Sequence, residues 1–359
     1  MIRLTSLAAV LVAVYVAGLG LEPRPPDDPY LRTAAAFVDD GVLQRGAWGL
    51  GLPLLIAPAE ALGGLRAVEL LLVAVAALGF VLGALLARRV VPEPYASAGA
   101  ALAGLSAPAI VFAGEVGPEA VGGTLLAGAT LCTAIARDAP RPAPVLGAAA
   151  MLAVLPWLDP LLLLPALPVT VALYLWCRRA RHKTLGLIAA ELVGGSVVLY
   201  VSLNERLYGG PTPWSALPSG VSPTGATTVA EHLERIPRLV TLWLDPADGL
   251  LRWAPVFALA FFAAWLLRRA RGERLARVVP SHAAAEAAAG LALAVAGAVV
   301  LVAAFLVPGI DTEPFSARHL VPALPVASAL IAWGLRHAPR IGAVLGVVSL
   351  GLSAWLFVG

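Results

Sequence analysis

The sequence contains few charged residues for its length. Of 359 residues, 47 are charged (25 basic and 22 acidic), which is 13% of the chain and about half of the share usual in a soluble domain. Apolar residues make up 60%, and the mean hydropathy is +0.86. These values exclude a soluble globular domain, a coiled coil and a disordered tail, and they indicate a polytopic membrane protein.

Cysteine and histidine are scarce, and the usual enzyme motifs are missing. The two cysteines, Cys132 and Cys177, lie in apolar runs, so we expect no disulfide framework. The five histidines are scattered, which argues against a histidine metal site. The net charge of +3 gives no reason to expect nucleic-acid binding. The chain has no P-loop and no GxGxxG, HExxH, CxxC or GxSxG motif, so the common signatures of soluble enzymes do not apply.

Apolar runs of about 20 residues, long enough to cross a bilayer, recur along the chain. Ten of them are clear: 4–21, 65–87, 95–113, 117–136, 161–177, 184–203, 250–267, 283–307, 320–335 and 341–358. The positive-inside rule decides two shorter stretches, because 145–158 must cross and 50–62 must not if the basic clusters are to share one side. We therefore predict an all-α bundle of about eleven spans, a single transmembrane domain over residues 1–359 with no soluble domain, and a re-entrant or interfacial segment at 50–62.

The charges divide unequally between the two sides of this topology. Cytoplasmic segments hold 16 basic and 5 acidic residues, whereas outward segments hold 9 basic and 17 acidic ones. This division predicts a multi-pass protein of the cell (inner or plasma) membrane with its N-terminus inside and its C-terminus outside. The acids concentrate in the outer loops, chiefly 22–64 and 204–249, so we expect any active site on the outer face.

The first outer loop contains adjacent carboxylates, Asp27 and Asp28, before an amphipathic stretch. Apolar residues at helical spacing predict a short interfacial helix with Asp28 as N-cap, Pro29 as first residue and Gly41 at the end. Capping is the simple interpretation of Asp28. Two neighbouring carboxylates beside an apolar surface also raise each other's proton affinity, which suits a general base or a metal ligand.

Other outer turns carry polar residues for which a structural interpretation competes with a functional one. Glu115 and Glu119 stand at the mouth of two spans, where a first-turn acid also favours the helix dipole. Trp157 and Asp159 form a tight turn, where the indole suits an interfacial belt. The adjacent cations Arg318 and His319 suit either a phosphate clamp or contact with lipid head groups.

Two further features complete the pattern. Residues 227–240 predict a second amphipathic helix carrying Arg235 and Arg238. Glu191 lies within an apolar span, where we expect an interhelical partner because an unpaired charge is costly there.

The order of several motifs resembles the GT-C superfamily of polytopic glycosyltransferases, and in particular the bacterial relatives of dolichyl-phosphate-mannose-dependent protein mannosyltransferases. The resemblance covers most of the chain. It rests on Asp27-Asp28-Pro29-Tyr30, the glycine- and proline-rich stretch 48–58, Gly117-Pro118-Glu119, 155–160, Asn204 with 207–209, 249–257 and 316–325.

This resemblance implies transfer of a sugar, hexosyl or pentosyl, from a polyprenyl-phosphate donor to a glycan, lipid or protein acceptor on the outer face. Asp28 or Asp27 would be the general base of an inverting displacement, and Arg318, with Arg252, would hold the donor phosphate. The remaining substrate-site residues would be Glu119, Glu115, His319, Tyr30, Trp157 and Asp159. The resemblance identifies no certain cofactor and leaves a divalent cation, Mg²⁺ or Mn²⁺, open. Membrane lipids are expected partners, and nucleic acid is not.

Two alternatives remain open from the sequence. A lipid or solute transporter or flippase would place polar residues and broken helices near mid-membrane. A catalytically inactive scaffold would keep the GT-C-like fold without its substrate.

Overall fold

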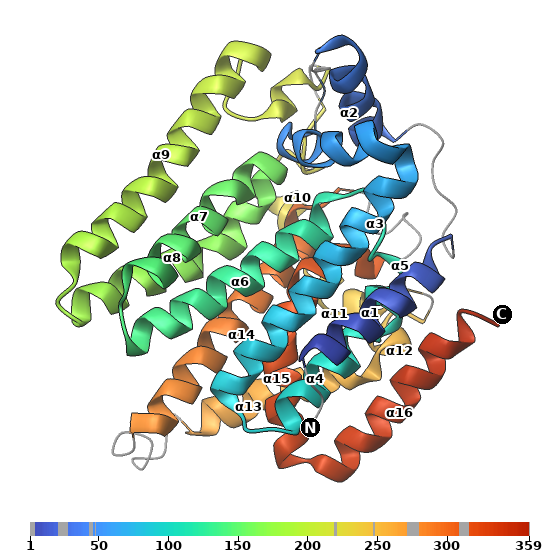
Figure 1. Cartoon of the computed structure of the whole chain (residues 1–359), viewed down its shortest axis with the longest axis vertical. Coiled ribbons are helices and arrows are strands. Elements are labelled where there is room, and N and C mark those ends of the chain that lie inside the picture. Colours follow the sequence, from blue (N-terminus) through green and yellow to red (C-terminus); the bar gives the residue numbers. More distant parts are fainter. Residues whose placement is uncertain are drawn as a thin grey trace.

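The computed structural model of the chain describes residues 4–20, 28–42, 46, 48–218, 221–246, 248–270, 280–308 and 316–358. Within these ranges every regular element is helical, which confirms the all-α prediction. The long helices lie side by side as a bundle (Figure 1). They are α1 (Leu4–Gly18), α3 (Gly51–Val90), α6 (Pro118–Asp138), α7 (Pro142–Leu158), α8 (Leu163–Arg179), α9 (Lys183–Tyr208), α13 (Ala258–Ala270), α14 (Pro280–Leu306), α15 (Leu324–His337) and α16 (Pro339–Trp355).

Six helical stretches in the described part of the chain are long and apolar enough to cross a membrane, and three shorter apolar helices accompany them. The shorter ones are α1, α7 and α16. This agrees with a multi-pass bundle, while the number of eleven spans stays a prediction. At 1.5 Å per residue, the 21 residues of α6 extend about 30 Å, the thickness of a hydrocarbon core.

Helices α3, α6 and α15 form the centre of the bundle, since more than half of the most apolar stretch of each is buried and they contact one another. Helix α9 lies at one edge and α16 at the opposite edge (Figure 1). Glycines allow close approach at the centre. A Cβ on Gly83 would lie 2.3 Å from the carbonyl oxygen of Pro325, and one on Gly99 would lie 2.7 Å from the backbone nitrogen of Ala332. Small residues at such contacts are the usual means of tight helix packing in membranes.

The first interfacial helix is confirmed as α2 (Pro29–Asp40). Asp28 caps it, and Gly41 ends it in the left-handed conformation, with φ 66°. The next segment, expected to be re-entrant or interfacial, is the first part of α3. The backbone leaves helical geometry at Gly63 and Gly64, where Gly64 has φ 61°, and α3 changes direction there (Figure 1). A bend at these two residues separates the short segment from the span that follows.

The prediction of a single amphipathic helix over residues 227–240 is wrong in its extent. Two short helices, α10 (Val229–Leu233) and α11 (Arg238–Leu244), replace it. Pro237 lies between them and lacks the N–H that a continuous helix needs. Arg235 donates a hydrogen bond to the carbonyl of Phe305 (2.8 Å) and Arg238 to that of Val307 (3.0 Å). The two arginines therefore bind carbonyls at the C-terminal end of α14, which have no helical partner.

Several expected spans also begin or break at proline. The run 95–113 divides into α4 (Tyr95–Gly104) and α5 (Ala107–Val111). Short 3₁₀ segments precede three long helices: η1 (Pro160–Leu162) precedes α8, η3 (Pro255–Phe257) precedes α13, and η5 (Ser316–Ala323) precedes α15. The short helix α12 (Leu250–Trp253) lies just before η3. A further 3₁₀ segment, η2 (Pro213–Ala216), follows α9. Each of these 3₁₀ segments contains a proline.

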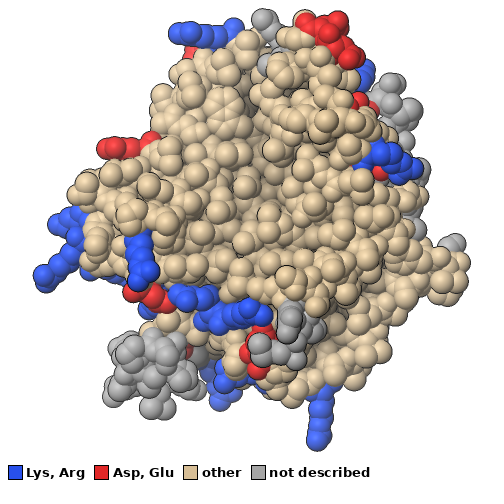
Figure 2. All heavy atoms as spheres, in the orientation of Figure 1, with Lys and Arg blue, Asp and Glu red and all other residues tan. Residues whose placement is uncertain are grey.

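One charge departs from its expected environment. Glu191 is exposed on the surface of α9 and forms no ion pair with any described residue, so the prediction of an interhelical partner is wrong. Elsewhere the charged side chains gather toward the ends of the bundle, and the face shown in Figure 2 has a broad uncharged band across its middle. This is the distribution that a hydrocarbon layer requires.

The close approach at Gly83 predicts that a glycine-to-alanine substitution has opposite effects on stability at Gly83 and at Gly195. Gly83→Ala forces α3 away from α15 and should lower the free energy of unfolding by about 1–3 kcal/mol, as overpacking usually does. Gly195→Ala on α9 meets nothing within 4 Å and should stabilise by up to about 1 kcal/mol through helix propensity. Thermal unfolding in detergent, followed by circular dichroism, measures both; equal Tm values would contradict this packing.

Candidate active site

Polar side chains from five separate segments meet at one end of the bundle. We call this set the acidic cluster. It comprises Asp28 before α2, Glu115 in the turn after α5, Glu119 in the first turn of α6, Asp159 between α7 and η1, and Arg318 with His319 in η5. Nearly 300 residues of sequence separate its first and last members, so the fold, not local sequence, brings these groups together.

Arg318 is the centre of the cluster. Its Nη1 lies 2.7 Å from Oε1 of Glu115, and its Nε donates to Oε1 of Glu119 at 3.1 Å. All three side chains are partly buried, with 31%, 23% and 17% of their surface exposed respectively. A Cβ at position 117 would lie 2.2 Å from a carboxylate oxygen of Glu119, so Gly117 leaves the space that this ion pair occupies.

Asp28 both caps α2 and belongs to the cluster. Its Oδ1 accepts hydrogen bonds from the backbone N–H groups of Tyr30 (2.8 Å) and Leu31 (3.1 Å), and Oδ2 takes no part in these two bonds. Burial raises the pKa of the Asp28 carboxyl; the two backbone bonds and the charge of Arg318 oppose this rise, and the charge of Glu119 adds to it. The result is a half-buried carboxylate with increased proton affinity and one oxygen outside the capping interaction.

The pKa of Asp159 is strongly raised. Burial raises its pKa to about 6, the backbone N–H of Leu161 and the charge of His319 oppose the rise, and Glu119 adds to it. Burial, followed by the charges of Glu119 and Asp159, also raises the pKa of the Tyr30 hydroxyl. Glu119, Asp159 and His319 line a cavity of about 50 Å³, which has room for one or two water molecules.

Not every residue predicted for the site lies in the cluster. Trp157 donates from Nε1 to the hydroxyl of Ser196 (2.9 Å) and packs edge-on against Tyr200, so its indole is directed toward α9. Arg252 is exposed and its guanidinium lies over Trp253, 5.4 Å from the ring centre. No contact among the described residues joins Arg252 to Arg318 or to the carboxylates. Asp27 lies outside the described residues.

Sequence reasoning missed two residues beside the site. Gly117 was recognised only as part of a turn. Tyr200, near the end of the apolar run 184–203, is 3% exposed, and its hydroxyl has no hydrogen-bond partner among the described residues. The charge of Asp159 acts on that hydroxyl. A tyrosine near the outer end of a predicted span was the available signal for it.

A metal ion was left open by the sequence. Within the described ranges, no three His, Cys, Asp or Glu side chains are grouped closely enough to hold one, so we derive no step through a metal.

A large apolar groove lies beside η5. It has a volume of about 590 Å³ and is lined by residues of α11, α12, η3, α13, α14, η5 and α15. Leu320 and Ala323 line it from η5, the element that also carries Arg318 and His319. One short 3₁₀ segment therefore links the charged cluster to an apolar groove.

The arrangement of the helices is a GT-C-like fold, as the resemblance in sequence implied. The structural neighbours include ArnT from Cupriavidus metallidurans bound to undecaprenyl phosphate, with a TM-score of 0.63 and 17% identity, covering 92% of this chain and 60% of ArnT. The apo state of the same protein matches with a TM-score of 0.64 and 18% identity over 95% of this chain and 61% of ArnT. The chain thus spans about three fifths of the length of ArnT. No family model and no curated protein matches the sequence.

The raised pKa of Asp159 predicts that the parent protein and the variant Asp159→Asn differ in stability by an amount that depends on pH. Because the folded state holds this proton up to about pH 6 and the unfolded state only to about 3.8, the carboxylate destabilises the fold progressively as pH rises through this window. Asp159→Asn keeps an acceptor for the Leu161 N–H and carries no charge. Its Tm should equal that of the parent near pH 4 and exceed it at pH 7. A Tm difference that does not change with pH would contradict the assignment.

Proposed function

We propose that the chain is a glycosyltransferase that moves a sugar from a polyprenyl-phosphate donor to a hydroxyl group of an acceptor, at the outer face of the cell membrane. The observation that carries this proposal is the position of η5, which contributes Arg318 to the acidic cluster and Leu320 to the apolar groove. A donor with a long apolar chain and a phosphate needs both environments side by side. The ArnT structure with bound undecaprenyl phosphate supports the same class of donor.

The donor would lie with its polyprenyl chain in the groove and its phosphate at Arg318. The groove is apolar along its whole lining, so burial of the chain provides most of the binding free energy. A guanidinium is suited to bidentate contact with phosphate. Glu115 and Glu119 fix its position, and the phosphate would replace one of these carboxylates as its partner.

Asp28 would act as the general base. Oδ1 is held by the N-terminus of α2, which leaves Oδ2 to accept the proton of the acceptor hydroxyl. As the hydroxyl oxygen forms its bond to the anomeric carbon, the bond from that carbon to the phosphate oxygen breaks. The electron pair leaves with polyprenyl phosphate, whose charge Arg318 stabilises. Attack opposite the leaving group inverts the anomeric carbon.

The proposal extends to both hexosyl and pentosyl donors and to glycan, lipid or protein acceptors. Because the donor carries its own leaving group, the enzyme needs no nucleotide pocket. In the proposed orientation the acidic cluster faces outward and the N-terminus lies in the cytoplasm, in agreement with the distribution of basic residues in the sequence.

The role of Asp28 is tested by Asp28→Asn. Asparagine is as good an N-cap as aspartate, so α2 should persist, whereas a general base contributes about 10²- to 10⁴-fold to the rate. We expect release of polyprenyl phosphate from a panel of hexosyl and pentosyl polyprenyl phosphates to fall at least about 100-fold.

Asp40→Asn is the matched control, because Asp40 is an exposed carboxylate at the other end of the same helix. Asp27→Asn is measured in parallel. Full activity of Asp28→Asn together with loss of activity in Asp27→Asn would identify Asp27 as the general base. Full activity of both would refute this mechanism.

The donor groove is tested by Gly297→Leu on α14. Gly297 lines the groove, and a Cβ there meets nothing within 4 Å, so the added side chain fills the groove without disturbing the protein. We expect binding of undecaprenyl phosphate, measured by native mass spectrometry, to weaken about tenfold, which corresponds to about 1.4 kcal/mol.

Gly195→Leu on α9 is the control, since a Cβ at that position also meets nothing within 4 Å and Gly195 does not line the groove. An equal loss in both variants would show that the groove does not hold the lipid.

A further inference from the structure

A second polar cavity lies at the end of the bundle opposite the acidic cluster. It has a volume of about 450 Å³ and opens between the ends of α3, α14 and α15. Its polar and aromatic lining consists of Arg88, Arg89, Arg336, His337, Glu286 and Trp333. We call it the basic pocket. The two sites are separated by the length of α6, whose first turn carries Glu119 and whose last residue, Asp138, binds Arg89.

Two helix C-termini supply its positive charge. Arg88 and Arg89 stand in the last turn of α3, and Arg336 and His337 in the last turn of α15. Cations are favoured there by the helix dipole. With histidine neutral, the lining holds three arginines and a single carboxylate, Glu286.

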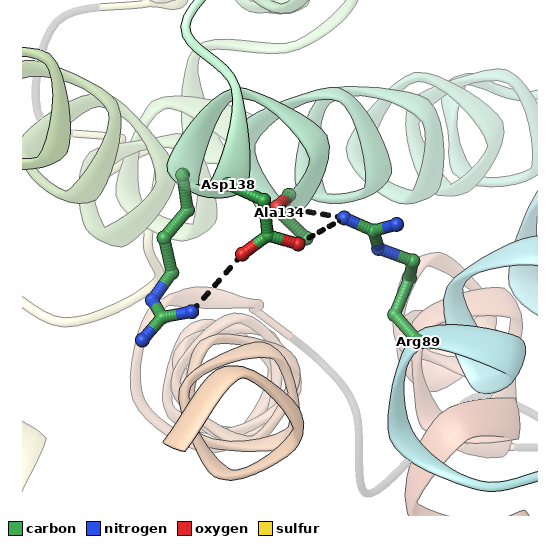
Figure 3. Close-up of polar contacts among 4 residues, drawn as sticks. Arg89, Ala134 and Asp138 are labelled. Atoms are coloured by element: carbon green, nitrogen blue, oxygen red, sulfur yellow. Dashed lines mark hydrogen bonds and ion pairs between the residues drawn. The ribbon is translucent and has the colours of Figure 1, made fainter. Parts of the chain in front are cut away.

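The two arginines from α3 are fixed in place. Arg88 donates to Glu93 at 2.6 Å. Arg89 binds the carboxylate of Asp138 and the carbonyl of Ala134, as Figure 3 shows. Arg137 approaches the same carboxylate at 3.1 Å. These contacts hold one wall of the basic pocket rigid.

The opposite wall is arranged differently. The ring nitrogen Nδ1 of His337 lies 3.0 Å from the carbonyl of Trp333. Arg336 is exposed and forms no ion pair with any residue that the structure describes. An exposed arginine without an ion pair among the described residues therefore faces two paired arginines across the cavity.

The remaining lining is apolar and includes Val90, Val91, Pro92 and Ala285. A free phosphate ion makes no favourable contact with such an apolar surface, whereas the ester region of a phospholipid packs against it. Trp333 has the amphipathic character of residues that lie at the level of lipid head groups. Basic pockets between the cytoplasmic ends of transmembrane helices are suited to anionic head groups.

We propose that the basic pocket binds the head group of an anionic phospholipid from the leaflet that surrounds the basic ends of α3 and α15. The phosphate is held between Arg336 and the α3 arginines, and the glycerol esters lie against Val90 and Val91. This inference does not depend on the proposed transferase activity.

The test uses the purified full chain in phosphatidylcholine nanodiscs containing dibrominated phosphatidylglycerol, whose bromine atoms quench nearby tryptophan. Phosphatidylglycerol should quench at lower mole fraction than dibrominated phosphatidylcholine, and Trp333→Phe should remove that difference. Arg336→Gln should weaken the apparent affinity for phosphatidylglycerol at least about tenfold. This exceeds the roughly fivefold that one surface charge contributes.

Arg340→Gln is the matched control, because Arg340 is an exposed arginine at the start of the neighbouring α16 and does not line the basic pocket. It should lose no more than about fivefold. Equal losses in the two variants would reduce the effect to general attraction and overturn the proposal. Abolition of the quenching by millimolar glycerol phosphate or inorganic phosphate would overturn it as well, since a site for a soluble phosphate would then explain the pocket.

Discussion

A hydrocarbon layer accepts a helix only if its backbone is satisfied and its surface is almost free of charge, and this constraint governs the rest of the structure. Along α6, the charged residues are Glu119 in the first turn and Arg137 and Asp138 at the end. In α3, Arg88 and Arg89 stand in the last turn, and the ion pair of Arg66 with Glu69 lies just after the bend at Gly63 and Gly64. Charge therefore accumulates where helices begin and end, and separate chain segments bring enough of it together to form sites at both ends of the bundle.

Proline-containing breaks between helices determine which groups meet at the acidic cluster. The turn before Pro160 presents Asp159, and the 3₁₀ turn that includes Pro322 presents Arg318 and His319. An α-helix at the position of η5 would rotate successive side chains by about 100°. In a 3₁₀ helix, side chains three residues apart point in the same direction. In η5 the cations are directed to the carboxylates, while Leu320 and Ala323, three positions apart, line the groove. The local distortion is therefore what joins a charged site to an apolar one.

Features encoded within a few residues were predictable from the sequence, and those that depend on tertiary contact were not. The cap, first residue and end of α2 follow from Asp28, Pro29 and Gly41, and the structure confirms all three. The break at Pro237 could have been foreseen, but amphipathic spacing on both sides suggested one helix. Other outcomes have no local signal. The pairing of Arg318 with two glutamates joins positions about 200 residues apart, and the indole of Trp157 is directed to α9 by a hydrogen bond to Ser196.

The capping and catalytic interpretations of Asp28, which seemed to compete in the sequence, are compatible in the structure. A carboxylate has two oxygens, and the cap uses Oδ1 alone. The N-terminus of α2 fixes the orientation of the group, while burial and Glu119 raise its affinity for a proton. In the proposed function, a donor phosphate entering this region would add negative charge to four carboxylates. Since the pKa of Asp159 is about 6, that carboxyl could then take up a proton, which would reduce the repulsion between the phosphate and the carboxylates.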